Sequence, residues 1–240
     1  MYERNNYFEV CHATRIERNH GVNAIIFGGT GMVGRGVLRE CLLDPDVLHV
    51  LSIVRSPSGQ LHPKLRELVH ENFFDFSSIE SELAGFDAAF FCLGATSAGK
   101  TEQQYSRVTY DITMAVAEPL ARLNPDMTFV FVSGAGTDST ERGRAMWARV
   151  KGRTENALMR LPFKATYMFR PGLIQAMHGV RSKTPLYRIP YLILWPLMPW
   201  LRRRFPQYFT TTEQIGRAML AVAKHGTPKT VLESADINKL

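Results

Sequence analysis

The sequence predicts an α/β fold in which a doubly wound parallel sheet carries helices on both of its faces. Short apolar runs, typical of buried strands, alternate along the chain with stretches of helical spacing. A glycine-rich turn follows the first of these runs and opens the first helix. Hydrophobic residues make up 45% and charged residues 21% of the 240 residues, which excludes a disordered, collagen-like or coiled-coil chain.

Strands and helices are expected where apolar runs end in turn residues. Asp44-Pro45 ends the first helix, and Asn124-Pro125 ends the second, which Thr101 begins as its N-cap. The expected strands are 22–27, 47–54, 69–73, 86–93, 127–132 and 165–169, followed by 229–233 near the C-terminus. The expected helices are 32–43, 101–123, 141–161 and 212–223.

The chain divides into three expected parts. Residues 1–20 show no regular apolar period and lack the composition of a signal or transit peptide, so a loosely ordered extension is expected. Residues 21–171 form the main domain, and 172–240 form a small C-terminal subdomain, because the strand–helix alternation stops there. The three cysteines lie far apart, which is typical of a reducing compartment and predicts a cytoplasmic protein.

Positive charge is concentrated in the second half of the chain. Residues 142–204 hold 14 of the 29 basic residues but one of the 22 acidic residues, Glu155. Such a stretch either binds an anion, such as a phosphorylated cofactor, a membrane surface or a nucleic acid, or is a solvated basic face. Nucleic acid is not expected, because no helix-turn-helix, zinc-finger or RNA-binding signature accompanies the charge.

Residues 189–201 form an apolar segment that three prolines interrupt. It is too short to span a membrane, which takes about 20 residues. The segment either lines the pocket of an apolar small-molecule substrate, or docks on an anionic membrane with Trp195, Trp200 and the arginines 202–204, or packs between copies of the chain. The oligomeric state stays open. The seven histidines show no close ligand spacing, so no metal site is expected.

The strongest site signal is a GxxGxxG turn between the first strand and the first helix. Glycines permit a tight turn there, and the N–H groups at the helix N-terminus attract a pyrophosphate. A side chain at Gly34 would also push the helix away from the strand. The turn therefore favours an NAD(P)-binding Rossmann fold over an ordinary glycine-rich turn. The expected cofactor-binding residues are Gly28, Thr30, Gly31, Met32, Val33 and Gly34.

The end of the second strand indicates which dinucleotide binds. An NAD-preferring site usually carries an Asp or Glu there, bonded to the ribose 2′-hydroxyl. Here Arg55 and Ser56 follow the strand, and an Arg can grip a 2′-phosphate with two hydrogen bonds. The sequence therefore predicts NADP(H), with NAD(H) as the alternative, unless Arg55 is merely a surface residue of a loop.

A second glycine loop competes for the nucleotide. Residues 94–101 (GATSAGKT) match GxxxxGK[ST], the phosphate loop of NTPases, and lie between a strand and a helix. An NTPase also needs an Asp after another apolar strand to hold magnesium. The strands ending at 54, 132 and 169 are followed instead by Arg55, Ser133 and Arg170, so a dinucleotide is favoured.

One further pattern spans most of the chain, because each expected strand is followed by a characteristic residue or turn. These are, in order, Gly28-x-x-Gly31-x-x-Gly34, Arg55, Asp75-Phe76, Cys92-Leu93-Gly94, Ser133 with Lys151 on the next helix, and Arg170-Pro171-Gly172. This order resembles the short-chain dehydrogenase/reductase superfamily. More narrowly, it resembles the atypical, extended members described as NAD-dependent epimerase/dehydratase-like or Tat-interacting-protein-like oxidoreductases. The resemblance covers about residues 22–240 and is most specific before residue 171.

The resemblance implies roles for cofactor-binding residues beyond the glycine turn. Asp75 and Phe76 would contact the adenine. Cys92, Leu93 and Gly94 would line the cofactor beneath its ribose.

The resemblance also implies a catalytic centre. Ser133 would polarise a substrate carbonyl, and Lys151 would hold the hydroxyls of the nicotinamide ribose. The family expects a Tyr four residues before this Lys as general acid/base, but Trp147 stands there, and an indole N–H does not titrate in water. From spacing alone, Ser133 could simply end a strand, and Lys151 could belong to a solvated, arginine-rich helix.

Two functions therefore stay open. The first is an NADP(H)-dependent oxidoreductase or epimerase-like enzyme, whose proton would come from water, the substrate or another group. The second is a dinucleotide-binding protein without turnover, a redox sensor or assembly partner, in which Trp147 closes the site.

Overall fold

The computed structural model describes residues 21–179, 204–205 and 207–240. The expected extension at 1–20 and the apolar segment at 189–201 lie outside the described residues. The strands are β1 (Val22–Phe27), β2 (Val47–Val54), β3 (Leu65–Val69), β4 (Ala88–Phe91), β5 (Thr128–Val132), β6 (Ala165–Arg170), β7 (Leu173–Gln175), β8 (Phe209–Thr211) and β9 (Val231–Glu233). The α-helices are α1 (Met32–Leu43), α2 (Glu102–Ser106), α3 (Ile112–Leu123), α4 (Met146–Leu158), α7 (Thr212–His225) and α8 (Ser234–Ile237), with a 3₁₀-helix η1 (Ser77–Leu83) and a π-helix η2 (Arg107–Asp111).

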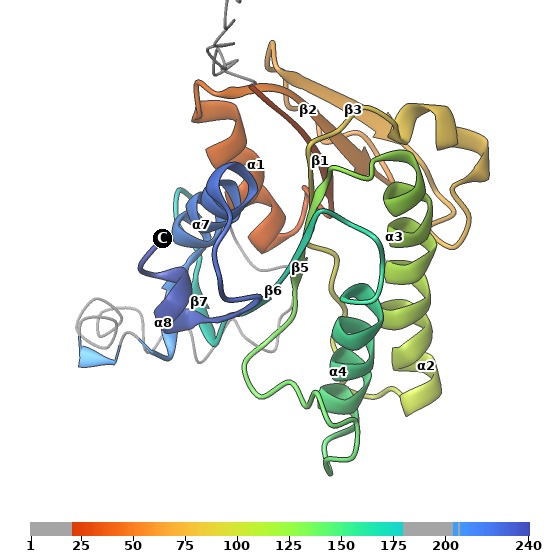
Figure 1. The fold of residues 1–240 in the computed structure, drawn as a ribbon, viewed down its shortest axis with the longest axis vertical. Helices are drawn as coiled ribbons and strands as arrows, with labels where there is room; N and C mark the ends of the chain where they lie inside the picture. The colour runs from red at the N-terminus through yellow and green to blue at the C-terminus, as the bar shows by residue number, and fades with distance from the viewer. Residues whose placement is uncertain (1–20, 180–203, 206) are drawn as a thin grey trace, which may run out of the picture.

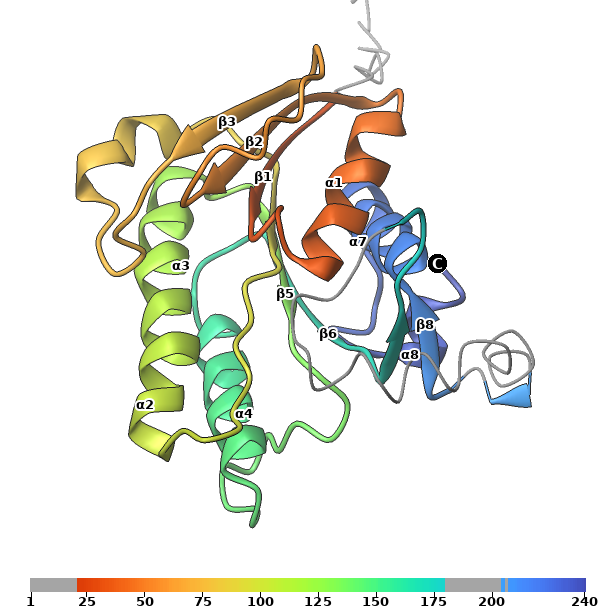
Figure 2. The ribbon, with the colours of Figure 1, turned by 180° about the vertical axis from the view of Figure 1, so that it is seen from behind.

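The expected doubly wound parallel sheet is confirmed. Its order is β3-β2-β1-β4-β5-β6-β9, and each strand pairs in parallel with its neighbours. Helices α1 and α7 cover one face, and α2, α3 and α4 cover the other, as Figures 1 and 2 show. A separate apolar core fills each face. The order of strands reverses between β1 and β4, where ligands of such sheets bind beyond the carboxyl ends.

The third strand lies earlier than the sequence predicts. The expected strand at 69–73 is wrong, because the ladder with β2 runs over Leu65–Val69. After β3 the chain turns around the ring of His70, whose Nε2 lies 2.7 Å from the carbonyl oxygen of Asn72 and 2.8 Å from that of Asp75. Phe73 belongs to this turn, and its side chain is buried. Its apolar character therefore reflects core packing and not a strand.

The two long helices also depart from expectation. The helix expected at 101–123 begins with the predicted cap, because the Thr101 hydroxyl accepts from the backbone N–H of Gln104 at 3.2 Å, but the π-helix η2 interrupts it. The helix expected at 141–161 begins only at Met146. The carboxylate of Asp138 accepts the backbone N–H groups of Thr140, Arg142 and Gly143 and so holds the preceding residues in a loop.

The described C-terminal residues pack on the main sheet. Helix α7 lies against α1, where Lys224 forms ion pairs of 2.7 Å with both Asp44 and Asp46. Strand β9 extends the sheet beside β6. The division at residue 172 stays a prediction.

Candidate functional site

The glycine turn leaves the N-terminus of α1 open toward the carboxyl edge of the sheet. Gly28 adopts a φ of 86°, and its carbonyl accepts the N–H of Gly31 at 2.9 Å. Gly31 is the N-cap of α1, and no side chain of the described residues caps the helix there. A Cβ at Gly34 would lie 2.0 Å from the Gly28 oxygen, so strand and helix meet backbone to backbone. The first-turn N–H groups can therefore bind an anion.

The turn after β4 meets the glycine turn directly. A Cβ at Gly28 would lie 2.9 Å from the carbonyl carbon of Cys92 and 2.9 Å from the nitrogen of Leu93. The Cys92 N–H also donates to the Phe27 carbonyl at 2.8 Å. The structure thus brings together the first and the fourth of the motifs that the sequence singled out. Burial raises the pKa of the Cys92 thiol to about 12, so this residue is a neutral part of the turn.

Ser52 presents a polar group beneath the glycine turn. It lies on β2 and is 1% exposed, and its hydroxyl has no hydrogen-bond partner among the described residues. A Cβ at Gly29 would lie 2.6 Å from the Ser52 oxygen. The hydroxyl fills the space beneath Gly29, so the turn can lie close to β2 only without a side chain at that position. Sequence reasoning missed Ser52, because a Ser within an apolar strand gives no signal of its own.

The competing loop at 94–101 is organised differently. The Thr101 hydroxyl is committed as the cap of α2, and the Gln104 side chain bonds back to the Thr101 N–H at 3.0 Å. The Lys100 ammonium donates to the carbonyl of Thr96 at 2.9 Å. The helix end is thus closed by its own side chains. Of the two glycine loops, the one after β1 is therefore the better site for a phosphate.

Arg55 and Asp75 lie beyond the carboxyl ends of β2 and β3. Both are exposed, and the Asp75 carboxylate accepts the backbone N–H of Ser77 at 2.9 Å. Phe76 is buried instead, with its ring 5.9 Å from that of Phe27 and 4.7 Å from that of His70. The Phe76 side chain belongs to the core. The adenine contacts that the resemblance implies for Asp75 and Phe76 stay predictions.

Ser133 follows β5 at the same edge of the sheet. It is 7% exposed, and its hydroxyl lies 3.0 Å from that of Thr137. The Thr137 hydroxyl donates its own proton to the carbonyl of Gly134 at 2.7 Å. In the hydrogen bond between the two hydroxyls, Ser133 is therefore the donor and Thr137 the acceptor. The hydroxyl is therefore positioned, and its donation to a substrate carbonyl stays a prediction.

Lys151 and Trp147 lie one turn apart on α4. The Lys151 ammonium donates to the carbonyl of Val132, the residue before Ser133, at 3.4 Å. It also lies 5.3 Å from the centre of the Phe131 ring. Burial lowers the pKa of Lys151 to about 8, while the nearby Glu155 opposes the shift. Trp147 is partly buried, and a Cβ at Gly136 would lie 3.5 Å from its ring. The structure therefore gathers the expected catalytic residues at one strand end.

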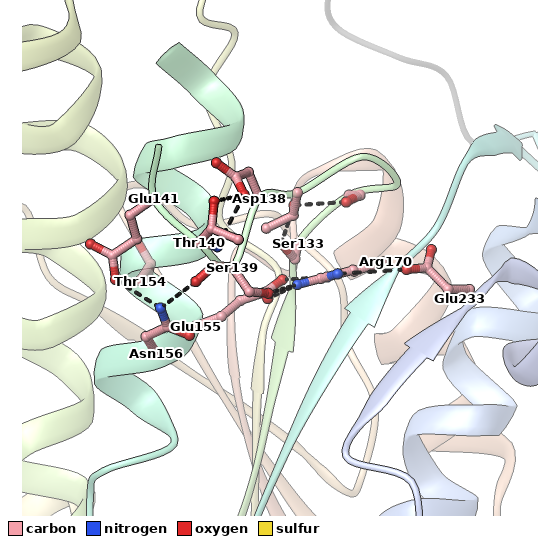
Figure 3. Close-up of polar contacts among 12 residues, drawn as sticks. Ser133, Asp138, Ser139, Thr140, Glu141, Thr154, Glu155, Asn156, Arg170 and Glu233 are labelled. Carbon is pink, nitrogen blue, oxygen red and sulfur yellow. Dashed lines mark hydrogen bonds and ion pairs between the residues drawn. The ribbon is translucent and has the colours of Figure 1, made fainter. Parts of the chain in front are cut away.

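A buried ion pair stands behind this centre, and the sequence did not reveal it. Figure 3 shows Arg170 of β6 between Glu155 of α4 and Glu233 of β9. Its guanidinium holds both Glu155 oxygens, with Nε at 3.0 Å, and donates to the Ser139 hydroxyl at 2.6 Å. Glu155 is fully buried. The single acid of the basic stretch is thus a structural partner of Arg170.

A cavity of about 790 Å³ lies on the outer side of α4, against α2 and η2. None of the predicted site residues lines it. It is edged by Arg107, Arg149 and Arg153 together with Glu102, Asp111 and Glu141. Within the described ranges, no group of three His, Cys, Asp or Glu side chains is placed to hold a metal. No described helix is long and apolar enough to cross a membrane.

The chain is similar to fungal proteins named mitochondrial. It is 30% identical over 155 residues to protein FMP52, mitochondrial, of Eremothecium gossypii, covering 64% of this chain and 66% of that protein. It is 27% identical over 226 residues to protein fmp52-2, mitochondrial, of Aspergillus oryzae, covering 90% and 96%. The match therefore spans just under two thirds of the first relative. These names contradict the expected cytoplasmic location, since scattered cysteines do not distinguish one reducing compartment from another.

Solved structures share the fold. The enzyme WbmF of Bordetella bronchiseptica in complex with NAD+ has a TM-score of 0.61 at 16% identity, covering 91% of this chain and 77% of that chain. Uronate dehydrogenase of Agrobacterium tumefaciens has a TM-score of 0.60 at 18% identity, covering 88% and 75%. No family model matches the chain. Strand order and structural likeness agree, and the chain has the Rossmann-type α/β fold that these nucleotide-binding structures share.

Proposed function

We propose that the chain is an NADP(H)-dependent oxidoreductase. The observation that carries the proposal is the N-terminus of α1 behind the glycine turn, which no side chain of the described residues caps and which suits the pyrophosphate of a dinucleotide. The NAD+ in the WbmF structure and the dehydrogenase named among the neighbours support the same cofactor class. When bound, a nicotinamide supplies or accepts a hydride.

The residues of this chain divide the remaining work. The glycine turn would bind the pyrophosphate, and Arg55 would meet a 2′-phosphate beyond β2. Lys151 would hold the nicotinamide ribose. Ser133 would turn its hydroxyl from Thr137 to a substrate carbonyl. The names of the fungal relatives support a mitochondrial location for this chain, which fractionation of cells would test.

Arg55→Gln is expected to weaken NADPH binding about 10- to 100-fold, because a charge-assisted hydrogen bond contributes about 1.5–3 kcal/mol. NADH binding should stay the same, since NADH has no 2′-phosphate. Calorimetric titration of each nucleotide measures both values. Arg66→Gln is the matched control, because Arg66 lies on the adjacent strand and pairs with Glu82 at 2.7 Å. Equal losses for NADPH and NADH would contradict the assignment.

A second function is a dinucleotide-binding protein without turnover, and Trp147 at the expected Tyr position favours it. Trp147→Tyr separates the two functions. In an otherwise intact active site, a phenol at this position should raise carbonyl reduction by about tenfold or more. The reduction of a quinone followed by NADPH absorbance measures the change. A wild type and a variant that both bind NADPH but reduce no quinone would favour the protein without turnover.

A further inference from the structure

Carbonyl reduction by this chain needs a proton source that Trp147 cannot be. Hydride addition to a carbonyl carbon leaves negative charge on the oxygen, and a proton must neutralise it. The indole N–H at position 147 does not titrate in water. The described residues near the end of β5 offer the hydroxyls of Ser133 and Thr137, which bond to each other, and the ammonium of Lys151.

Lys151 is held where it can serve this purpose. Its side chain is partly buried, and among the described residues its ammonium has a single long hydrogen bond, 3.4 Å to the Val132 carbonyl. The face of the Phe131 ring lies 5.3 Å from the nitrogen. An ammonium has three protons to donate, so at least one is available to a ligand at the strand end.

The natural counter-ion of Lys151 is occupied elsewhere. Glu155 lies one turn further along α4, but both of its oxygens bind Arg170, which Glu233 and Ser139 also hold. No carboxylate of the described residues forms an ion pair with Lys151.

The charged side chains of α4 and of the elements packed against it contact other partners or border the cavity beside α2 and η2. Arg149 of α4 binds Glu102 of α2, and Arg153 lies 4.1 Å from the ring centre of Tyr110 in η2. Asp111 of η2 and Arg107 border the outer cavity.

We propose that Lys151 is the proton donor when this chain reduces a carbonyl, in the place where the resemblance expects a tyrosine. The inference rests on the proposed function. The carbonyl carbon accepts the hydride of a reduced nicotinamide and forms the C–H bond. The carbonyl π electrons form the O–H bond with a proton from Lys151 Nζ, which becomes a neutral amine that water reprotonates. The carbonyl gains two electrons, and the nicotinamide loses them.

The direction of the pKa shift agrees with this role. Burial brings the pKa of Lys151 down to about 8, and a general acid works best when its pKa lies near the working pH. The donor is the protonated form. Reduction should therefore be full below this pKa and fall as pH rises through it.

The first test needs neither cofactor nor substrate. In protein with ¹³C-labelled lysine, the Lys151 Cε signal, assigned by its loss in Lys151→Arg, should titrate near pH 8 and not near the ordinary value of about 10.4. Glu155→Gln should lower that midpoint further, because it removes a carboxylate that favours the charged form. A wild-type midpoint at the ordinary lysine value would overturn the proposal.

The second test follows NADPH-dependent reduction of 9,10-phenanthrenequinone against pH. In the wild type, kcat should fall above about pH 8. Lys151→Arg keeps a cation for ribose binding but cannot release its proton, so kcat should fall about 100-fold while NADPH affinity changes less than about threefold. An unchanged kcat in this variant, or wild-type protein that binds NADPH without reducing the quinone, would overturn the proposal. If wild-type protein fails to bind NADPH, the proposed function is wrong. The NMR titration of Lys151 needs no cofactor, so its result distinguishes this failure from a failure of the proton-donor proposal.

Discussion

Gly34→Ala is expected to abolish NADPH binding, with a loss of about 100-fold or more, equivalent to about 2.7 kcal/mol. The added methyl would lie 2.0 Å from the carbonyl oxygen of Gly28 and 2.6 Å from its carbon. Neither atom belongs to a side chain that could turn away, so α1 must move from β1 and its N–H groups leave the phosphate position. The free energy of unfolding should also fall by about 1–3 kcal/mol.

Calorimetric titration and denaturant unfolding measure the two effects separately. Lys100→Met is the matched control, because Lys100 is the lysine of the competing phosphate-type loop, where its ammonium donates to the carbonyl of Thr96 at 2.9 Å. The control should fold and bind NADPH normally. If Lys100→Met removed nucleotide binding while Gly34→Ala preserved it, the loop after β4 would be the binding site.

Arg170→Met is expected to lower the free energy of unfolding by about 3–5 kcal/mol, the usual cost of leaving one partner of a buried ion pair alone. Glu155 is fully buried, and the side chain of Arg170 is 13% exposed, so water cannot solvate the remaining carboxylate. The change would also release β6 from α4 and β9, which Arg170 joins. Urea unfolding followed by circular dichroism measures the loss.

The double variant Glu155→Met/Arg170→Met should be markedly more stable than Arg170→Met. It replaces the pair by two flexible apolar side chains and leaves no buried charge between them. A double variant as unstable as the sum of both single variants would show that Glu155 and Arg170 contribute independently, and the ion-pair account would be wrong.

The region from β1 to α1 could be predicted because its determinants are local. An apolar run, a glycine turn and a helix that stops at Asp44-Pro45 occupy one continuous stretch, and the structure has the same bounds. The third strand could not be placed from its sequence. In the apolar run at 69–73, the first residue ends the strand, whereas the later ones belong to a turn that packs on the core. The contacts of the His70 ring determine where the strand ends.

The candidate site shows the same limit. Motifs placed the glycine turn, Ser133 and Lys151 at one edge of the sheet, because parallel strands end together. The spacing of Lys151 and Glu155 is that of a helical ion pair, yet Glu155 binds Arg170, and only the packing of α4 on β6 determines that choice. The Ser52 hydroxyl beneath Gly29 likewise depends on the register of β1 and β2.

Calorimetric titration of the wild-type protein with NADPH, NADH and ATP–magnesium distinguishes dinucleotide binding at the N-terminus of α1 from nucleotide binding at the loop after β4. The open end of α1 and the exposed Arg55 predict that NADPH binds at least about tenfold more tightly than NADH, a difference of about 1.4 kcal/mol. ATP–magnesium should bind more weakly than either dinucleotide. Failure of NADPH to bind, together with binding of ATP–magnesium, would show that α1 does not bind a dinucleotide and would assign the nucleotide to the loop after β4.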